Sequence, residues 1–422
     1  MPCSGRNSPR GSSKHVARFR LFAVFFLAFC LRVFAVAAFQ GLASPPKAEA
    51  NPDQLDYETI AYNLSTGHGY AKVPGVPTAI RPPGTPLALL PPYVLFGRSY
   101  LAARLWIVLL SSLTCLAVGV LAKTALGPEA ALPAALALAV YPGHLYYAMH
   151  FLSETPYALF LTLALASSCR SLLAARSHWW DVVAGASWGV AILTRVELLA
   201  VVPVAWILVS LAARPHRRAC AARVLAQTLV VFLCLAPWVA RNVVQMKSAT
   251  LSTQRGFTFW GVHNQITLND GKLAGGWVRH SLLVDDQHPL TGTEVEREAQ
   301  AFSYGIEFVS GHLRSMPYLT VMKLWRVVDP FIDTPNRAVR VLLAAGWFVL
   351  VPFVVCGAMV MIKGRQWTAF ATLASPLLAL VVTTVVFYGS QRYRDALAPV
   401  FVTIATAAYL RLRERFSLSD IL

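Results

Sequence analysis

Charged residues are scarce in this sequence, and acidic ones are the scarcest. Only 14% of the 422 residues are charged, whereas 56% are hydrophobic and the mean hydropathy is +0.54. A soluble globular protein of this length does not normally have such a composition. The sequence therefore predicts an all-α polytopic membrane protein.

Sequence signals for a nucleotide site, a metal site or a disulfide framework are also missing. There is no Gly-rich phosphate loop followed by a lysine and no GxGxxG between a strand and a helix, so no nucleotide site is predicted. The histidines form no HExxH pattern, which gives no sign of a metal site. The seven cysteines show neither zinc spacing nor a disulfide framework.

Long apolar runs are what the sequence has in abundance. A bilayer crossing takes about 20 residues, and runs of this length lie at 19–40, 101–122, 129–148, 153–174, 181–213, 222–241, 341–362, 367–388 and 395–411. The run at 181–213 is too long for one crossing and is interrupted by the polar sequence TRVE at 194–197, so it predicts two helices. The expected fold is a bundle of about ten transmembrane helices.

Basic residues predict how this bundle is oriented. The N-terminal segment carries Arg6, Arg10, Lys14, Arg18 and Arg20 without an acid, so it is predicted to be cytoplasmic. With that start, the basic loops around 123, 170–176, 214–223, 363–365 and 411–415 also face the cytoplasm. The net charge of +17 follows from this orientation, and no nucleic acid partner is expected. We expect an uncleaved first span and a multi-pass protein of the inner (cytoplasmic) membrane.

The same topology divides the chain into five segments. Residues 1–18 are a disordered cytoplasmic tail, and residues 412–422 are a second cytoplasmic tail. Residues 19–241 form a transmembrane module that includes an outer loop at 41–98, and residues 341–411 form the C-terminal transmembrane helices. Residues 242–340 form a small extracytoplasmic subdomain with an acidic helix around 294–307. Nearly every unusual polar residue then lies on the outer side, which faces the periplasm or the exterior.

The first outer loop opens with an acidic helix. Asn51 is expected to cap this helix, and Pro52 suits its first position. Asp53 shares the apolar helical face of Tyr57, so it is either an acid tolerated at a helix start or a functional carboxylate. Glu58 is expected to point toward solvent.

Further polar residues fall at the outer ends of other spans. Glu154 begins the fourth span, where the alternative is an ordinary helix-start acid. Arg195 and Glu197 lie where the fifth and sixth spans meet, and residues two apart on a helix have different partners. Trp238 and Arg241 end the seventh span, where such residues anchor a helix at the interface.

The last outer loop interleaves Arg392 and Arg394 with aromatic residues. The alternative to a functional role here is anchoring at the bilayer surface, together with a weak surface pair of Arg394 and Asp395.

Carboxylates and arginines at the outer headgroup level suit a phosphate-bearing lipid. An arginine holds a phosphate with a forked, permanent cation and stabilises it as a leaving group. A carboxylate takes the proton of an acceptor hydroxyl, which is the pairing that glycosyl transfer requires, and a single displacement inverts the anomeric centre. The candidate phosphate-binding residues are Arg81, Arg195, Arg241, Arg392 and Arg394.

The first outer loop resembles that of bacterial GT-C glycosyltransferases, in DQLDYETIAYNLSTGHGY at 53–70 and RPPGTPL at 81–87. These enzymes are relatives of the dolichyl-phosphate-mannose protein mannosyltransferases and of the lipid A aminoarabinose transferase. Further matches follow in the family's order, in SET at 153–155, LTRVE at 193–197, PWVARN at 237–242 and RYR at 392–394. The ordered set covers almost the whole chain and implies a GT-C type bundle.

The resemblance implies roles for single residues. Asp53 takes the position of the catalytic acid of the loop, as general base, and Glu154 matches a second acid near the acceptor or a cation. Arg81 opens the family's basic-Pro-Pro motif and contacts the lipid phosphate. Many relatives have a second acid directly after the first, whereas Gln54 follows Asp53 here, so a catalytic share for Asp56 stays open.

The resemblance also implies the substrates. The donor is a polyprenyl-phosphate-linked hexosyl or pentosyl group in the membrane lipid, and the acceptor is a protein, lipid A or another envelope glycan. Tyr57, His68, Glu197 and Asn242 are the candidate substrate contacts. No cofactor is implied with certainty, and a divalent cation is left open.

The alternative function is a multispan transporter or flippase for a polyprenyl-linked glycan. Such a protein has ionisable residues near mid-bilayer and broken helices paired in two related halves. In this sequence the charges gather at one face and the halves look unrelated, which favours the transferase. A catalytically inactive scaffold also stays open, because a fold does not fix function.

Overall fold

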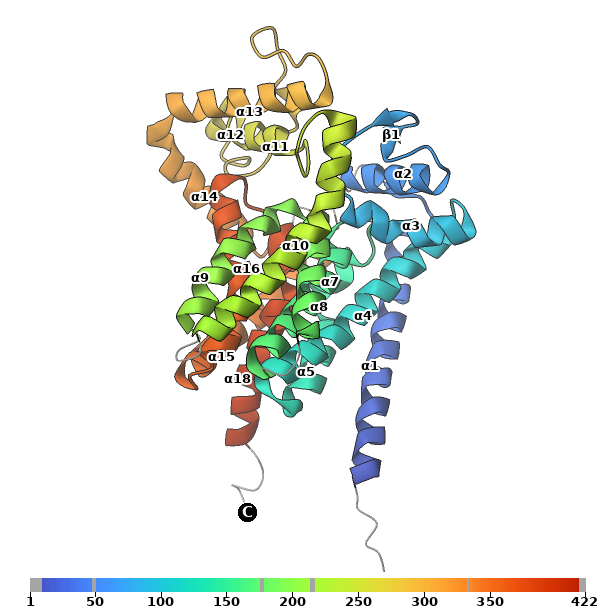
Figure 1. Cartoon of the computed structure of the whole chain (residues 1–422), viewed down its shortest axis with the longest axis vertical. Helices are drawn as coiled ribbons and strands as arrows, with labels where there is room; N and C mark the ends of the chain where they lie inside the picture. The colour runs from blue at the N-terminus through green and yellow to red at the C-terminus, as the bar shows by residue number, and fades with distance from the viewer. Residues whose placement is uncertain are drawn as a thin grey trace, which may run out of the picture.

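The computed structural model describes residues 10–47, 51–174, 178–212, 217–331, 334 and 336–416. Most of the described chain is helical, and a bundle of long helices carries a smaller helical cap at one end (Figure 1). The bundle helices are α1 (Arg10–Phe39), α4 (Tyr100–Leu126), α5 (Ala131–Val140), α6 (Pro142–Tyr147), α7 (Glu154–Ala174), α8 (Trp179–Thr194), α9 (Val201–Ala212), α10 (Arg217–Met246), α15 (Arg337–Lys363), α16 (Trp367–Val386) and α18 (Ala398–Arg415). The predicted all-α class is therefore confirmed.

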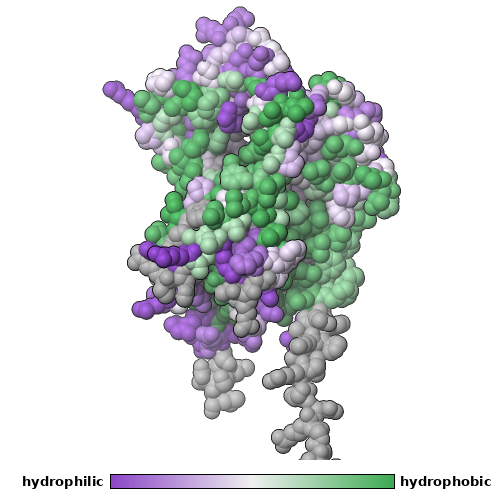
Figure 2. All heavy atoms as spheres, in the orientation of Figure 1, coloured by the Kyte–Doolittle hydropathy of each residue, from purple (hydrophilic) through white to green (hydrophobic). Residues whose placement is uncertain are grey.

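Each predicted apolar run coincides with one or two of these helices. Within the described residues, six helices are long and apolar enough to cross a membrane, namely α1, α4, α7, α10, α15 and α16. On the face drawn in Figure 2, hydrophobic residues cover the middle of the bundle, and hydrophilic residues gather at the top of the cap and at the opposite end. A multi-pass membrane protein is confirmed, whereas the number of about ten crossings stays a prediction.

The polar interruption of the run at 181–213 breaks the helix as predicted. α8 ends at Thr194, a short 3-10 helix covers Val196–Ala200, and α9 begins at Val201. Arg195 lies at the break with an extended backbone conformation. The break therefore frees this residue from the helix surface and lets its side chain turn inward.

A buried apolar cluster holds the middle of the bundle together. It includes Leu161 of α7, Ala191 of α8, Leu235 of α10, Leu373 of α16 and Val400 of α18, all nearly inaccessible to solvent. These helices therefore fix the positions of their own outer ends, where the polar residues lie.

The predicted tails are helical where the structure describes them. Residues 1–9 lie outside the described residues, but residues 10–18 belong to α1. α18 runs to Arg415, and residues 417–422 lie outside the described residues. Arg413 near this end faces Glu129 after α4 at 3.4 Å, so α4 and α18 end on the same side of the bundle.

The first outer loop folds into α2 (Asp53–Ser65), a hairpin of β1 (Ala71–Val73) and β2 (Val76–Pro77), and α3 (Gly84–Phe96). The cap expected from Asn51 was wrong, because α2 begins at Asp53 directly after Pro52 and no side chain caps it. Asn63 Nδ2 instead donates to the carbonyl oxygen of Ala71 at 2.8 Å and holds the hairpin against α2.

The expectation that Glu58 faces solvent was also wrong. Its side chain is 1% exposed and accepts hydrogen bonds from Arg98 Nε at 2.9 Å and Nη2 at 2.8 Å. Arg98 follows α3, which folds back onto α2 and covers this face. A contact between residues 40 positions apart thus overrides the local pattern of α2.

The cap consists of α11 (Arg255–Val262), α12 (Gln265–Asn269), α13 (Glu294–Gly311) and α14 (Met316–Val328). α13 is the acidic helix expected in this region, and Thr293 and Glu296 form a capping box at its start. Glu298 of α13 accepts hydrogen bonds from the amide of Gly256 at 2.9 Å and from Arg255 Nε at 3.0 Å. These bonds tie α13 to α11 within the cap.

Candidate functional site

A cavity of about 710 Å³ lies between the outer ends of the bundle helices and the cap. Its polar side includes Asp53, Arg81 and Arg392 from the first and last outer loops, and its apolar side includes Val382 and Phe387 at the end of α16. The cavity therefore presents charges next to a hydrophobic wall.

Asp53 is held between two arginines. Arg81 Nη2 donates to Asp53 Oδ1 at 2.6 Å, and Arg392 Nη1 donates to Asp53 Oδ2 at 2.9 Å. Arg81 stands at the end of the loop that follows the hairpin, and Arg392 belongs to α17 (Gln391–Asp395). The first residue of α2 thus meets segments from both ends of the chain.

Glu154 lies on the other side of Arg392 from Asp53. As the first residue of α7 it is buried, with a side chain that is 1% exposed. It accepts a hydrogen bond from Arg392 Nε at 2.6 Å, and Arg195 Nη1 lies 3.8 Å from the same carboxylate oxygen. Arg195 donates in turn to Glu197 at 2.9 Å. The expectation that these two residues have different partners was wrong, because Arg195 has an extended backbone at the helix break and helical spacing does not apply there. Arg392 therefore bridges Asp53 and Glu154.

These contacts continue into one chain of alternating charges. Asp56 accepts hydrogen bonds from Arg81 and also lies 2.5 Å from Lys72 Nζ on β1. The members in order are Lys72, Asp56, Arg81, Asp53, Arg392, Glu154, Arg195 and Glu197. Half of them are cations and half are anions, so their formal charges cancel.

The arginines set the ionisation of Asp53. Burial alone would raise the pKa of this carboxyl, but the guanidinium groups of Arg81 and Arg392 outweigh burial and hold its pKa well below the ordinary value. Burial raises the pKa of the neighbouring Tyr57 to about 12, so this phenol stays neutral. The Tyr57 ring lies beside Arg81, with the guanidinium carbon 5.4 Å from the ring centre. Asp53 is therefore an anion at every pH of physiological interest.

Arg241 and Asn242 are not brought into this chain of charges. Arg241 donates to the carbonyl oxygens of Thr78 at 2.8 Å and Tyr70 at 3.2 Å, and to the Asn242 side chain at 2.8 Å. Asn242 donates to the carbonyl oxygen of Thr250 at 2.7 Å. Both residues fasten the first outer loop and the start of the cap to the end of α10.

Arg394 and His68 also lie elsewhere. The Arg394–Asp395 pair exists at 2.9 Å, but the expectation that it lies on the surface was wrong, since both side chains are 2% exposed. Arg394 also donates to the carbonyl oxygen of Asp329 at 2.7 Å, which joins α17 to the end of α14. His68 is exposed in the turn after α2, where its Nδ1 lies 2.8 Å from the Thr66 hydroxyl.

Several residues that line the cavity were not predicted. Tyr388 and Tyr393 of the last outer loop face it, and the Tyr393 ring centre lies 4.6 Å from the Arg195 guanidinium carbon. The alternation of aromatic and basic residues in this loop was the available signal. Trp277 of the cap also lines the cavity, and Lys72 begins the chain of charges, but neither has a local sequence signal.

The carboxylates of the site all face cations. Among the residues that the structure describes, no group of three or more His, Cys, Asp or Glu side chains is arranged to hold a metal ion. A divalent cation at Asp53 or Glu154 would have to displace an arginine from its carboxylate.

Part of the chain matches a known sequence family. Residues 81–240 match the family described as Dolichyl-phosphate-mannose-protein mannosyltransferase. The matched segment includes Arg81, Glu154 and Arg195, whereas Asp53 and Arg392 lie outside it. No curated protein sequence matches the chain significantly.

Solved structures resemble the fold over nearly the whole chain. The archaeal oligosaccharyltransferase AglB from Archaeoglobus fulgidus, in complex with an inhibitory peptide and a dolichol-phosphate, aligns with a TM-score of 0.57 and 14% identity over 96% of this chain and 52% of its own. The apo form of the Archaeoglobus fulgidus oligosaccharyltransferase aligns with a TM-score of 0.55 and 14% identity over 95% of this chain and 51% of its own. ArnT from Cupriavidus metallidurans bound to undecaprenyl phosphate aligns with a TM-score of 0.47 and 15% identity over 98% of this chain and 80% of its own. The chain spans about half the length of the oligosaccharyltransferase, and the likeness at these identities concerns the fold.

Proposed function

We propose that this chain, which has the GT-C fold and is related to the dolichyl-phosphate-mannose protein mannosyltransferases, is a membrane glycosyltransferase. It moves a sugar from a polyprenyl-phosphate donor to an extracytoplasmic acceptor and inverts the anomeric centre. The site faces the periplasm or the exterior, and the acceptor is a protein, lipid A or an envelope glycan.

The observation that carries this proposal is the position of Asp53 between Arg81 and Arg392 in a cavity with an apolar wall. A polyprenyl phosphate has an anionic head and a long hydrocarbon tail, which are the two properties that this cavity complements. The fold neighbour AglB is described in complex with a dolichol-phosphate, a lipid of the same chemical class. The matched family is likewise named for a dolichyl-phosphate-linked sugar.

The geometry supports a direct displacement. The donor phosphate takes hydrogen bonds from Arg81 and Arg392, which turn part of their donors away from Asp53. The acceptor hydroxyl oxygen then forms a bond to the anomeric carbon as the bond from that carbon to the phosphate oxygen breaks. Asp53 takes the hydroxyl proton, and the lipid phosphate leaves as an anion stabilised by the two guanidinium groups.

The partners of Asp53 explain how a weakly basic carboxylate becomes a base. In the free site both arginines lower its pKa, so it binds a proton poorly. When the donor phosphate draws hydrogen bonds from the same arginines, the pKa of Asp53 rises toward its ordinary value. The base is therefore activated where a donor is bound.

Glu154 and Asp56 serve this site in supporting positions. Glu154 is almost inaccessible and holds Arg392 from behind, so it orients a phosphate ligand and does not meet the acceptor. Asp56 lies between Arg81 and Lys72 and fixes the direction of Arg81. Of the three carboxylates, Asp53 alone lines the cavity, which favours it as the base.

The test is sugar transfer from a radiolabelled polyprenyl-phosphate donor to envelope acceptors, by membranes that contain the wild-type protein or the Asp53→Asn variant. Asp285→Asn is a matched control, because Asp285 is 59% exposed in the cap and does not line the cavity. Transfer by the wild type and the control, but not by Asp53→Asn at equal expression, supports the proposal. Undiminished transfer by Asp53→Asn excludes Asp53 as the base. No transfer by any form across several donor sugars contradicts the enzyme and favours a transporter.

A further inference from the structure

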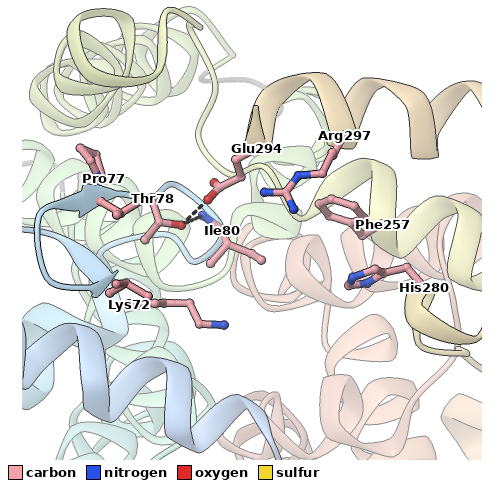
Figure 3. Close-up of a pocket in the computed structure, with 10 residues that line it drawn as sticks. Lys72, Pro77, Thr78, Ile80, Phe257, His280, Glu294 and Arg297 are labelled. Carbon is pink, nitrogen blue, oxygen red and sulfur yellow. Dashed lines mark hydrogen bonds between the residues drawn. The ribbon is translucent and has the colours of Figure 1, made fainter. Parts of the chain in front are cut away.

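A second, smaller cavity lies beside the first outer loop. It has a volume of about 260 Å³ and is enclosed by the β1–β2 hairpin, Phe257 of α11 and the first turn of α13 (Figure 3). We call it the hairpin pocket. Ile80 lines both this pocket and the larger cavity of the candidate site, so the two cavities are neighbours.

Three nitrogen-bearing side chains extend into the hairpin pocket from different elements. They are Lys72 of β1, His280 of the loop after α12 and Arg297 of α13 (Figure 3). Within the described part of the chain, the side chain of the exposed residue Arg297 has no hydrogen bond or ion pair, and His280 Nδ1 is a buried atom without a hydrogen-bond partner. A guanidinium without a partner is free to bind an anionic ligand through charge-assisted hydrogen bonds.

The one carboxylate in the hairpin pocket is already occupied. Glu294 accepts hydrogen bonds from the Thr78 hydroxyl at 2.6 Å, the Ala79 amide at 2.9 Å and the Thr253 hydroxyl at 2.5 Å. These donors hold the Glu294 carboxylate against the hairpin. Among the described residues, Glu294 forms no ion pair with Arg297. The Arg297 guanidinium is therefore left to an anionic ligand, and Lys72, which pairs with Asp56, lies beside it as a second cation.

The remaining walls are apolar. Val73, Val76, Ile80 and Phe257 surround the cationic groups, and Phe257 lies against the His280 ring with centroids 4.7 Å apart. A ligand for this pocket thus combines an anionic group with a face that tolerates hydrophobic contact. A sugar with a phosphate or carboxylate substituent has both properties.

We propose that the hairpin pocket binds a phosphate or carboxylate group of the acceptor glycan. This rests on the proposed function, since an acceptor must place a hydroxyl at Asp53 beyond Ile80. Lys72 connects the hairpin pocket with the candidate site, because it lines the pocket and pairs with Asp56 beside Arg81. An anionic group held by Arg297 and Lys72, beside the His280 ring, anchors the acceptor from the outer side while its hydroxyl reaches into the larger cavity.

Ligand-observed saturation-transfer NMR on the purified full-length protein in neutral phosphatidylcholine nanodiscs tests the pocket. The probes are mannose 6-phosphate and glucuronate, with uncharged glucose for comparison. Binding of either anionic probe is expected, with a loss of about tenfold or more in Arg297→Gln and a smaller loss in Arg297→Lys. Arg314→Gln is the matched control, because Arg314 is an exposed arginine of the same cap that does not line the pocket. It should bind like the wild type.

The outcomes separate this proposal from the proposed function. Binding that depends on Arg297, in a protein without any transferase activity, supports the anion pocket and contradicts the transferase. Transferase activity without Arg297-dependent binding of either probe overturns the pocket. Loss of probe binding in phosphatidylglycerol nanodiscs would show that a bilayer headgroup occupies it, which overturns the assignment to the acceptor. The relative affinities of mannose 6-phosphate and glucuronate distinguish a phosphate from a carboxylate acceptor.

Discussion

Arg392 and Asp53 are 339 positions apart in the sequence, yet Arg392 Nη1 donates to Asp53 Oδ2 at 2.9 Å. The same guanidinium donates through Nε to Glu154 at 2.6 Å. The first outer loop, the start of α7 and the last outer loop are thus fastened at one side chain. The polar side of the cavity exists only when these three segments are docked together.

Asp53 and Asp56 should differ sharply in their effect on transfer. General base catalysis contributes about 10²–10⁴-fold, so Asp53→Asn should lower kcat by that factor. Asp56→Asn should lower it by less than about tenfold, because Arg81 keeps its bond to Asp53. The measurement is single-turnover transfer at saturating donor. Equal losses in the two variants would show that the carboxylates share the proton transfer.

The pH profile should report the arginines beside Asp53. Burial raises the pKa of Asp53, but Arg81 and Arg392 lower it by more, so this group stays ionised as the pH falls through about 4, its ordinary pKa. Arg81→Gln removes one guanidinium, which raises the pKa and should move the acid limb of kcat/KM to higher pH. Arg81→Lys keeps a cation and should move it less. An acid limb at the same pH in Arg81→Gln and the wild type would contradict this account.

The same depressed pKa affects stability with a defined sign. A carboxyl with a lower pKa in the folded than in the unfolded protein stabilises the fold above the unfolded pKa of about 4. That stabilisation is lost as the pH falls toward the folded-state value. In Asp53→Asn the acid dependence of the unfolding temperature should therefore be shallower below about pH 4. If the unfolding temperature of Asp53→Asn fell with pH as steeply as that of the wild type, this account of the Asp53 pKa would be contradicted.

Glu154→Gln should destabilise the protein. The side chain is 1% exposed, so removal of its charge leaves a buried excess of arginine cations at a cost of about 3–5 kcal/mol. Glu129→Gln is the control, because Glu129 is 76% exposed and its pair with Arg413 is worth about 0–1 kcal/mol. Thermal unfolding in nanodiscs measures both. A Glu129 effect as large as that of Glu154 would mean that burial does not decide the cost.

Gly256→Ala should loosen the cap. A Cβ at Gly256 would overlap the carbonyl oxygen of Glu298, which is backbone of α13 and cannot move without shifting the helix. Such overpacking costs about 1–3 kcal/mol. Gly271→Ala is the control, because a Cβ there meets open space. Faster limited proteolysis of the cap is expected in Gly256→Ala alone, and equal rates in both variants would refute the packing argument.

The sequence was most informative where the membrane constrains the chain. Apolar length predicted the helices, and the polar interruption at Arg195 predicted the break between α8 and α9, because hydrocarbon leaves few alternatives to a helix. The order of polar motifs also identified Asp53, Arg81, Glu154 and Arg392, which the structure brings into contact.

The sequence was least informative where distant segments cover one another. Glu58 is buried because Arg98 folds back over it, and Arg394 is buried because α14 supplies carbonyl acceptors to it. Lys72 joins the chain of charges through the hairpin, whose position on α2 depends on a side-chain bond of Asn63. Neither helical periodicity nor hydropathy contains information about such tertiary contacts.

The cancelled charge of the Lys72–Glu197 chain bears on turnover. In the proposed reaction, the spent lipid phosphate is bound after transfer by the guanidinium groups that also pair with Asp53 and Glu154. These carboxylates remain next to the product and compete with it for the hydrogen bonds of the guanidinium groups. Each guanidinium that pairs again with a carboxylate binds the phosphate less tightly. The carboxylates of the site thus favour release of the lipid phosphate without an external counter-ion. In the resting site, the arginines are paired with these carboxylates, and the lipid phosphate must compete with them to bind.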